Sequence, residues 1–230
     1  MKELQHKFYV GQSGSGKTTY AKNDIKKIYK QYQLIVFLNT QHEAFVDAIT
    51  ENVVWSIGQL KTCVEQKKRI VVYKIPLEEE IDDVEEFEIL LRYLWYIKRL
   101  NEEKNILLII DEADRYCTKL RIPKLYSDLM TKGRRYNFVI WNITQRPQLV
   151  HNVLLTQTKQ MIIFELSRYD YDFMLKWFDY SNPSLYGYVI LENGQVIEQV
   201  AGVGKEEEKV NENGIKRTRE KLDNGNREKD

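Results

Sequence analysis

Short apolar runs alternate along this chain with longer segments in which apolar residues recur at helical spacing. The runs have the length of buried strands and occupy residues 7–10, 34–38, 53–55, 70–73, 105–110, 138–143 and 161–166. Helical patterns lie between several of them, at about residues 16–31, 56–69, 81–103, 123–132 and 169–178. Strands that alternate with helices predict an α/β fold, a mainly parallel sheet flanked by helices.

The two clearest elements of this pattern follow one another. Residues 81–103 carry a wide apolar stripe at 3.6-residue spacing, which includes Phe87, Leu91 and Leu94, and acidic residues crowd its first turns. Residues 106–110 are all apolar, as expected of a strand at the centre of a parallel sheet, which is buried on both faces.

The end of the sequence has a different pattern. Residues 186–191 and 195–200 are predicted to form a β-hairpin around the turn Glu192-Asn193-Gly194. Beyond Gly204 the sequence contains eight basic and eight acidic residues but only three apolar ones, too few to bury a core. We therefore expect one folded domain over residues 1–202 and a charged, disordered tail over residues 203–230.

The bulk composition sets limits on function. The 230 residues suffice for one α/β domain, and the 43% hydrophobic and 30% charged content is ordinary for a soluble protein. The formal net charge of +1 provides no general attraction to nucleic acid or membrane, so any DNA-binding surface must be a local patch. The residues that could bind zinc lack metal-ligand spacing; they are Cys63, Cys117, His6, His42 and His151.

No stretch of the sequence has the pattern of a signal peptide or the length of a membrane span. We therefore expect a cytosolic protein with reduced cysteines and no direct membrane insertion.

Residues 11–18 satisfy the pattern G-x-x-x-x-G-K-[ST] in full, and Thr19 follows in the predicted helix. They are Gly11, Gln12, Ser13, Gly14, Ser15, Gly16, Lys17 and Thr18. The glycines let backbone N–H groups turn inward on phosphates, Lys17 can reach the β- and γ-phosphates, and the Thr18 hydroxyl can bind Mg²⁺. A glycine-rich turn with an incidental lysine is the alternative, but the strand before it and the helix after it favour a site for ATP and Mg²⁺.

Two carboxylates, Asp111 and Glu112, end the buried strand at residues 106–110. Asp111 can hold Mg²⁺, directly or through water, and Glu112 can then orient or deprotonate an attacking water, which favours a hydrolase over a kinase. Acidic residues are also favoured at the start of a helix. Because the pair follows a complete phosphate loop, we interpret it as the Walker B element.

The next predicted strand begins after Gly133-Arg134-Arg135 and ends in Thr144-Gln145-Arg146-Pro147. A polar residue at the tip of the strand beside the acidic one can sense the γ-phosphate. An arginine that enters this strand lies near the outer edge of the domain, from which it could reach the ATP of a neighbouring subunit. A solvated helix end, where basic residues suit the helix dipole, is the alternative for both arginines.

These stretches together resemble the HerA/FtsK superfamily of hexameric DNA-pumping ATPases. That family typically shows a GxxGSGKT loop, an apolar strand ending in DE, and a segment that begins with GR and ends with TQRP. The matching residues here are 11–18, 106–112 and 133–147, and the likeness covers most of residues 5–180. It implies a RecA/ASCE-like P-loop fold, Gln145 as the sensor glutamine, and Arg134 as the arginine finger, with Arg135 as the second choice.

Three related classes fit less well. AAA+ proteins often end the sensor strand in T-N-R-P and need a helical lid, whereas this chain has Gln145 and a predicted hairpin. ABC-type ATPases need an LSGGQ-like signature, which the sequence lacks. Zot-type phage assembly ATPases share the acidic strand and the T-Q ending, but they usually carry a membrane segment.

Only six residues precede the first predicted strand, whereas HerA-like proteins usually have a β-barrel there. The chain therefore looks most like the small genome-packaging ATPases of membrane-containing icosahedral viruses. That resemblance implies a hexameric ring that pumps double-stranded DNA into a capsid, in the host cytoplasm or at a virion vertex, with a capsid or membrane protein as a further partner. A plasmid DNA-transfer ATPase and a non-translocating, ATP-driven assembly factor or switch remain open alternatives.

Four basic residues between the acidic pair and the next helix could track DNA phosphates in the channel of such a ring. They are Arg115, Lys119, Arg121 and Lys124. A solvated basic loop explains them equally well.

Overall fold

A computed structural model of the chain describes residues 4–38, 52–75 and 82–202. The strands in these ranges are β1 (Lys7–Val10), β2 (Leu34–Leu38), β3 (Val53–Val54), β4 (Ile70–Tyr73), β5 (Ile106–Ile110), β6 (Phe138–Thr144), β7 (Gln160–Phe164), β8 (Tyr188–Glu192) and β9 (Gln195–Val200). The α-helices are α1 (Lys17–Ile28), α2 (Ile57–Glu65), α3 (Asp83–Leu100), α4 (Ala113–Tyr116), α5 (Lys124–Lys132), α6 (Asn152–Thr156) and α7 (Arg168–Met174). Short 3₁₀ helices are η1 (Tyr29–Gln31), η2 (Gly133–Tyr136) and η3 (Pro147–Leu149).

The strands form one sheet in the order β3-β4-β2-β5-β6-β1-β7-β8-β9. All pairs from β3 to β7 are parallel, and β8 pairs antiparallel with both β7 and β9. Asn193 and Gly194, between β8 and β9, have φ values of 52° and 81°, as a two-residue hairpin turn requires. The prediction of a mainly parallel sheet with a C-terminal β-hairpin is confirmed.

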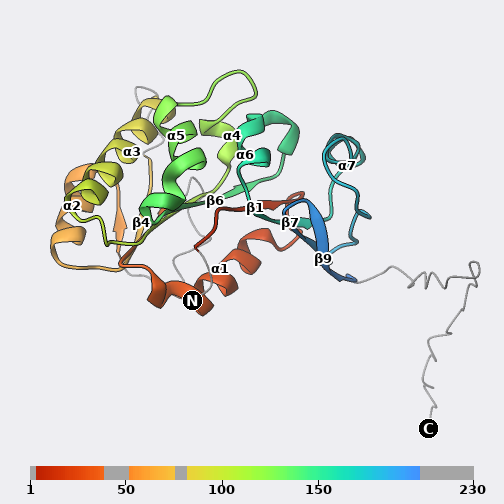
Figure 1. Cartoon of the computed structure of the whole chain (residues 1–230), viewed down its shortest axis with the longest axis horizontal. Coiled ribbons are helices and arrows are strands. Elements are labelled where there is room, and N and C mark those ends of the chain that lie inside the picture. Colours follow the sequence, from red (N-terminus) through yellow and green to blue (C-terminus); the bar gives the residue numbers. More distant parts are fainter. Residues whose placement is uncertain (1–3, 39–51, 76–81, 203–230) are drawn as a thin grey trace, which may run out of the picture.

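Helices cover both faces of the parallel part of the sheet. Helix α1 packs against one face, and α3, α5 and α6 lie against the other (Figure 1). Along β5, Leu108 and Ile110 belong to the core under α3 and α5, whereas Leu107 and Ile109 belong to the core under α1. Every residue of β5 is therefore buried, which explains why its sequence is apolar without alternation.

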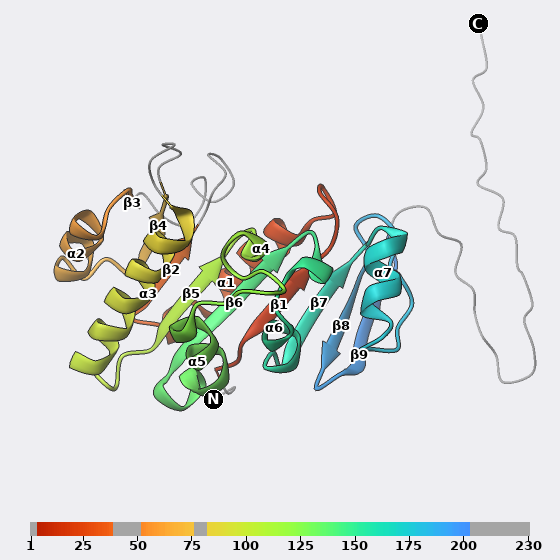
Figure 2. The ribbon, with the colours of Figure 1, turned by 90° about the horizontal axis from the view of Figure 1, so that it is seen from above.

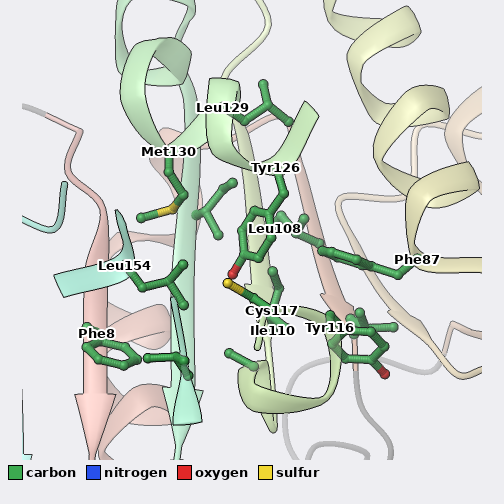
Figure 3. Close-up of a cluster of buried hydrophobic side chains, with 14 of the residues drawn as sticks. Phe8, Phe87, Leu108, Ile110, Tyr116, Cys117, Tyr126, Leu129, Met130 and Leu154 are labelled. Carbon is green, nitrogen blue, oxygen red and sulfur yellow. The ribbon is translucent and has the colours of Figure 1, made fainter. Parts of the chain in front are cut away.

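Helix α3 follows directly from its sequence signals. The carboxylate of Asp82 caps the helix by accepting a hydrogen bond from the Val84 N–H at 2.8 Å. Its first turn is acidic and its last turn basic, which suits the helix dipole. On its buried face Phe87 packs against Tyr116 and Tyr126, with ring centroids 4.7 Å and 5.2 Å away (Figure 3). This aromatic group fixes α3 to α4 and α5, and thus to the end of β5.

Some elements differ from the predictions. The helices α4 and α6 were not predicted, because four or five residues are too few to show a helical period. Helix α7 ends at Met174 rather than at about residue 178. The N–H groups of Trp177 and Phe178 both donate to the Met174 carbonyl, a tight turn that ends the helix.

Parallel pairing brings the carboxyl ends of β1, β5 and β6 to one edge of the sheet (Figure 2). The loop after β1 and the helix α4 after β5 lie at this edge. The connection from α5 into β6 lies at the opposite edge (Figure 2). The first edge is therefore where the predicted nucleotide site must form.

The predicted charged tail, residues 203–230, lies outside the described residues. Within the described ranges, the helices are all too short or too polar to cross a membrane.

Candidate nucleotide-binding site

Three glycines shape the loop after β1. Gly14 and Gly16 have φ values of 73° and 98°, in the left-handed region that favours glycine. Gly11 is required for space, because a Cβ there would lie 2.6 Å from the Cβ of Phe164. The three glycines of the motif are therefore explained by the backbone conformation and close packing of this loop.

Two backbone hydrogen bonds hold the start of this loop between the neighbouring strands. The Gly11 N–H donates to the carbonyl of Thr144, at the end of β6, at 3.3 Å. The Gln12 N–H donates to the carbonyl of Glu165, just after β7, at 2.9 Å. The loop thus forms a fixed cradle at the start of α1, where free N–H groups and the helix dipole favour an anion.

Lys17, the first residue of α1, lies back over the loop. Its Nζ donates a hydrogen bond to the carbonyl of Gln12 at 2.7 Å, and the residue is only 7% exposed. Burial lowers the pKa of this ammonium group from 10.5 to about 8, while the nearby Asp111 carboxylate raises it. The buried cation therefore has too little negative charge around it, which a phosphate group would supply.

Asp111 follows β5 and is 8% exposed. Its N–H donates to the carbonyl of Leu38 at 3.0 Å, which extends the pairing of β5 with β2. Burial, followed by the charge of Glu112, raises the pKa of Asp111 to about 6, although the Glu112 N–H and Lys17 lower it. A divalent cation beside Asp111 would stabilise its ionised form, so the environment fits the predicted Mg²⁺ ligand.

Thr18 and Thr19 follow Lys17 in the first turn of α1. Thr18 is half-buried and Thr19 is exposed. Thr18 and Asp111 are the two residues that would hold Mg²⁺, one at the start of α1 and the other at the end of β5.

Glu112 has a backbone conformation that is uncommon for residues other than glycine. Its φ of 53° and ψ of 51° lie in the left-handed region, and such residues are often found at functional sites. The turn leaves Asp111 buried and Glu112 half-buried. The Glu112 Oε2 atom lies 3.7 Å from Nη1 of Arg115, which also pairs with Asp83 at the start of α3. Arg115 therefore links the acidic pair to α3.

The strand between the loop and the acidic pair is β6, and its last residue connects the two. The Thr144 hydroxyl donates to Oδ1 of Asp114 at 2.6 Å and accepts from the N–H of Arg146 at 3.1 Å. Gln145, the predicted sensor, follows at the tip of β6 and is half-buried. Sequence reasoning missed the roles of Thr144 and Asp114, although each stands within three residues of a predicted site residue.

Arg134 and Arg135 lie apart from this group. They belong to η2, at the start of β6, and the seven residues of this strand separate them from its tip by about 20 Å. Arg134 is half-buried and lines a cavity of about 400 Å³ together with Trp177 and Phe178, whereas Arg135 is exposed. Within one chain neither arginine reaches the phosphate loop. Their predicted role as an arginine finger therefore requires the site of a neighbouring chain.

The four predicted DNA-contacting residues fall into two groups. Arg115 is half-buried beside acidic neighbours, whereas Lys119 and Arg121 are exposed between α4 and α5, and Lys124 is exposed at the start of α5. Lys119 and Leu120 form the tip of a two-residue turn, because the residues on either side exchange backbone hydrogen bonds of 2.9 Å and 3.2 Å. Leu120 is 96% exposed. This turn presents a basic and an apolar side chain on a fixed backbone.

The fold and the site define a class: the chain has a P-loop NTPase fold, with one strand between the loop strand and the acidic strand. Solved structures share this fold. The genome packaging NTPase B204 from Sulfolobus turreted icosahedral virus 2, in complex with ATP-gammaS, has a TM-score of 0.70 at 15% identity, over 88% of this chain and 100% of that one. VirB4 of Thermoanaerobacter pseudethanolicus has a TM-score of 0.62 at 11% identity, over 87% and 89% of the two chains.

A third structure, the pCW3 conjugation coupling protein TcpA with ATPgS, has a TM-score of 0.56 at 16% identity, over 86% of this chain and 60% of that one. At these identities the likeness establishes a shared fold. No protein-family model matches the chain, and no curated protein matches its sequence.

The lowered pKa of Lys17 predicts that binding of a nucleoside triphosphate takes up protons at pH 8. With a pKa of about 8, about half of the Lys17 side chains are neutral at that pH, and bound phosphate raises the pKa and protonates them. We expect uptake of about half a proton per site at pH 8 and much less at pH 7. Calorimetry in buffers of different ionisation enthalpy measures this number. Lys17→Arg stays charged, so uptake that persists in this variant would contradict the assignment.

Proposed function

We propose that this chain is an ATPase that moves double-stranded DNA, in the manner of a viral genome-packaging motor. The observation that carries the proposal is the meeting of the phosphate loop and the acidic pair at one sheet edge, on either side of β6. The names of the similar structures support it, since B204 is described as a genome packaging NTPase and was solved with ATP-gammaS.

The first step is the binding of ATP by the loop and Lys17. The Lys17 ammonium group exchanges its hydrogen bond to the Gln12 carbonyl for the β- and γ-phosphates, and so gains the negative charge that it lacks. Thr18 and Asp111 would hold Mg²⁺, which would supply positive charge beside the bound triphosphate. The N–H groups at the start of α1 bind the remaining phosphate oxygens.

The second step is attack by water on the γ-phosphorus of ATP, which breaks the bond to the bridging oxygen and releases ADP and phosphate. Glu112 orients this water and accepts its proton, while Gln145 senses the γ-phosphate from the tip of β6. The hydrogen bond from Thr144 to Asp114 holds the tip of β6 against α4, which supports a joint role for Gln145 and Glu112. Arg134 would complete the site of a neighbouring chain, because it stands at the far edge of its own sheet.

DNA would be contacted by the turn at Lys119 and Leu120, with Arg121 and Lys124 beside it. Basic side chains on a fixed turn can bind phosphates without reading the base sequence, as a translocating motor requires. In a homo-oligomeric ring, a hexamer by family resemblance, each subunit would offer one such turn to the duplex. The fold shared with the conjugation coupling protein TcpA makes a plasmid DNA-transfer ATPase the second candidate, with the same site and the same contacts.

Replacing the water-orienting carboxylate should separate binding from hydrolysis. We expect Glu112→Gln to bind Mg-ATP as tightly as the wild type and to hydrolyse it at least about 100-fold more slowly, because the general base is lost. Lys17→Ala should instead lose affinity for ATP. Glu103→Gln, at an exposed position, is the matched control and should retain full turnover. Near wild-type turnover by Glu112→Gln would show that another group orients the water.

Duplex DNA should stimulate ATP hydrolysis, and the turn should carry part of this effect. We expect double-stranded DNA to raise the steady-state ATPase rate, and Lys119→Ala to reduce the stimulation and its dependence on salt concentration, because one phosphate contact is lost. Lys68→Ala removes an exposed lysine elsewhere and should leave the stimulation unchanged. If duplex DNA does not change the ATPase rate at any protein concentration, a non-translocating assembly factor or switch is favoured.

A further inference from the structure

Tyr186 combines a strained backbone with an exposed side chain. Its φ is 62° and the residue is 59% exposed. The Gly187 N–H donates to the carbonyl of Ser184 at 2.8 Å, so Tyr186 is the third residue of a four-residue turn, a position where a positive φ normally selects glycine or asparagine. Burial of the ring does not offset this strain. The presence of a tyrosine at this strained position therefore requires another explanation, such as a functional one.

The turn is clamped against the end of β9. The Gly202 N–H donates to Oγ of Ser184 at 3.1 Å. A Cβ on Gly202 would overlap the carbonyl oxygen of Leu185, and a Cβ on Gly187 would lie 2.7 Å from the Gly202 nitrogen. The two glycines thus permit a direct backbone contact that any larger residue would prevent.

A side-chain anchor holds the chain just before this turn. Asn182 accepts a hydrogen bond from the N–H of Leu166 and donates one to its carbonyl, both at 3.0 Å. The segment that carries Tyr186 is therefore fixed on both sides, to the chain after β7 and to the end of β9. The backbone that carries the aromatic ring is thus ordered before a ligand binds, which lowers the entropic cost of a contact with that ring.

The exposed ring lies beside the phosphate loop. A Cβ on Gly16 would lie 3.9 Å from Cδ1 of Tyr186 and 3.9 Å from Cε1 of Phe164. Phe164 also packs edge-on against Tyr20 of α1, with centroids 5.7 Å apart, and Tyr20 packs against Tyr188 at 4.8 Å. The start of α1 is thus bordered by aromatic rings on the side of β7 and β8.

The strand order determines which part of a nucleotide meets Tyr186. The acidic pair follows β5, on one side of β1, so the γ-phosphate and the attacking water lie on that side. Strands β7 and β8 lie on the other side of β1, and Tyr186 leads into β8. A triphosphate held in the loop therefore directs its nucleoside towards Tyr186.

We propose that Tyr186 stacks on the purine base of the bound nucleotide and contributes to affinity through that base. This inference rests on the proposed ATPase site and adds the residue that recognises the nucleoside end of the substrate. Aromatic stacking on a base is worth enough to change affinity severalfold to a hundredfold, and a ring on an already ordered backbone loses less of this gain to conformational entropy.

The test compares Mg-ATP with Mg-tripolyphosphate, a probe that has the phosphates but no base. We expect Tyr186→Ala to weaken Mg-ATP binding by about tenfold and to leave tripolyphosphate binding unchanged. Tyr186→Phe keeps the ring and should bind Mg-ATP like the wild type. In steady-state kinetics Tyr186→Ala should raise KM with little change in kcat, because the base contact is made equally in the ground state and the transition state.

Tyr186→Gly separates recognition from a structural role. Glycine relieves the positive φ, so this variant should melt at least as high as Tyr186→Ala and still bind Mg-ATP about tenfold more weakly than the wild type. Unchanged ATP affinity in Tyr186→Ala would overturn the stacking role, as would an equal loss of tripolyphosphate binding. A wild-type protein that binds neither ligand would overturn the proposed function itself.

Discussion

The parallel pairing of β6 with both β1 and β5 is the constraint on which the rest of the structure depends. It aligns Val10 with Thr144 and Ile110 with Asn142, so the three strands end within two residues of one another. The phosphate loop and the acidic pair then stand two inter-strand spacings apart, about 10 Å, which is room for phosphates and a metal ion. Thr144 links the phosphate loop to the region of the acidic pair. Its carbonyl accepts a hydrogen bond from the Gly11 N–H, and its hydroxyl donates one to Asp114, two residues after the pair.

Burial at this edge of the sheet shifts the pKa values of the charged groups in the site. Lys17 and Asp111 both lose hydration, and burial moves their pKa values in opposite directions, to about 8 and about 6. Each charged form therefore gains from a partner of opposite charge, a polyanion for the lysine and a divalent cation for the carboxylate. In the described part of the chain, two residues with strained positive φ border this place, Glu112 on the side of β5 and Tyr186 on the side of β8. Glu112 would thus face the γ-phosphate of a bound nucleotide, and Tyr186 would face its base.

The sequence predicted those features that depend on neighbouring residues. The glycine spacing of residues 11–18 and the apolar run of β5 are local patterns, and both lie where the motif requires. Contacts between segments that are distant in the sequence could not be predicted in this way. The hydrogen bond from Thr144 to Asp114 and the pairing of Arg115 with Asp83 join residues about thirty positions apart, and packing alone decides them. Arg115 is an example, because this basic residue, predicted to contact DNA, also pairs with acidic side chains of its own chain that the sequence pattern did not reveal.

The same strand that unites the phosphate loop and the acidic pair keeps Arg134 away from them, so we predict a site completed by a second chain. Mixing two inactive variants tests this most directly. Arg134→Ala lacks the arginine but keeps the loop, and Lys17→Ala lacks a working loop but keeps the arginine. If the site is shared, the mixture should hydrolyse ATP although neither variant does alone, because some intact loops then meet intact arginines. If mixtures in which subunit exchange has been shown independently recover no ATP hydrolysis, the site is not shared between chains.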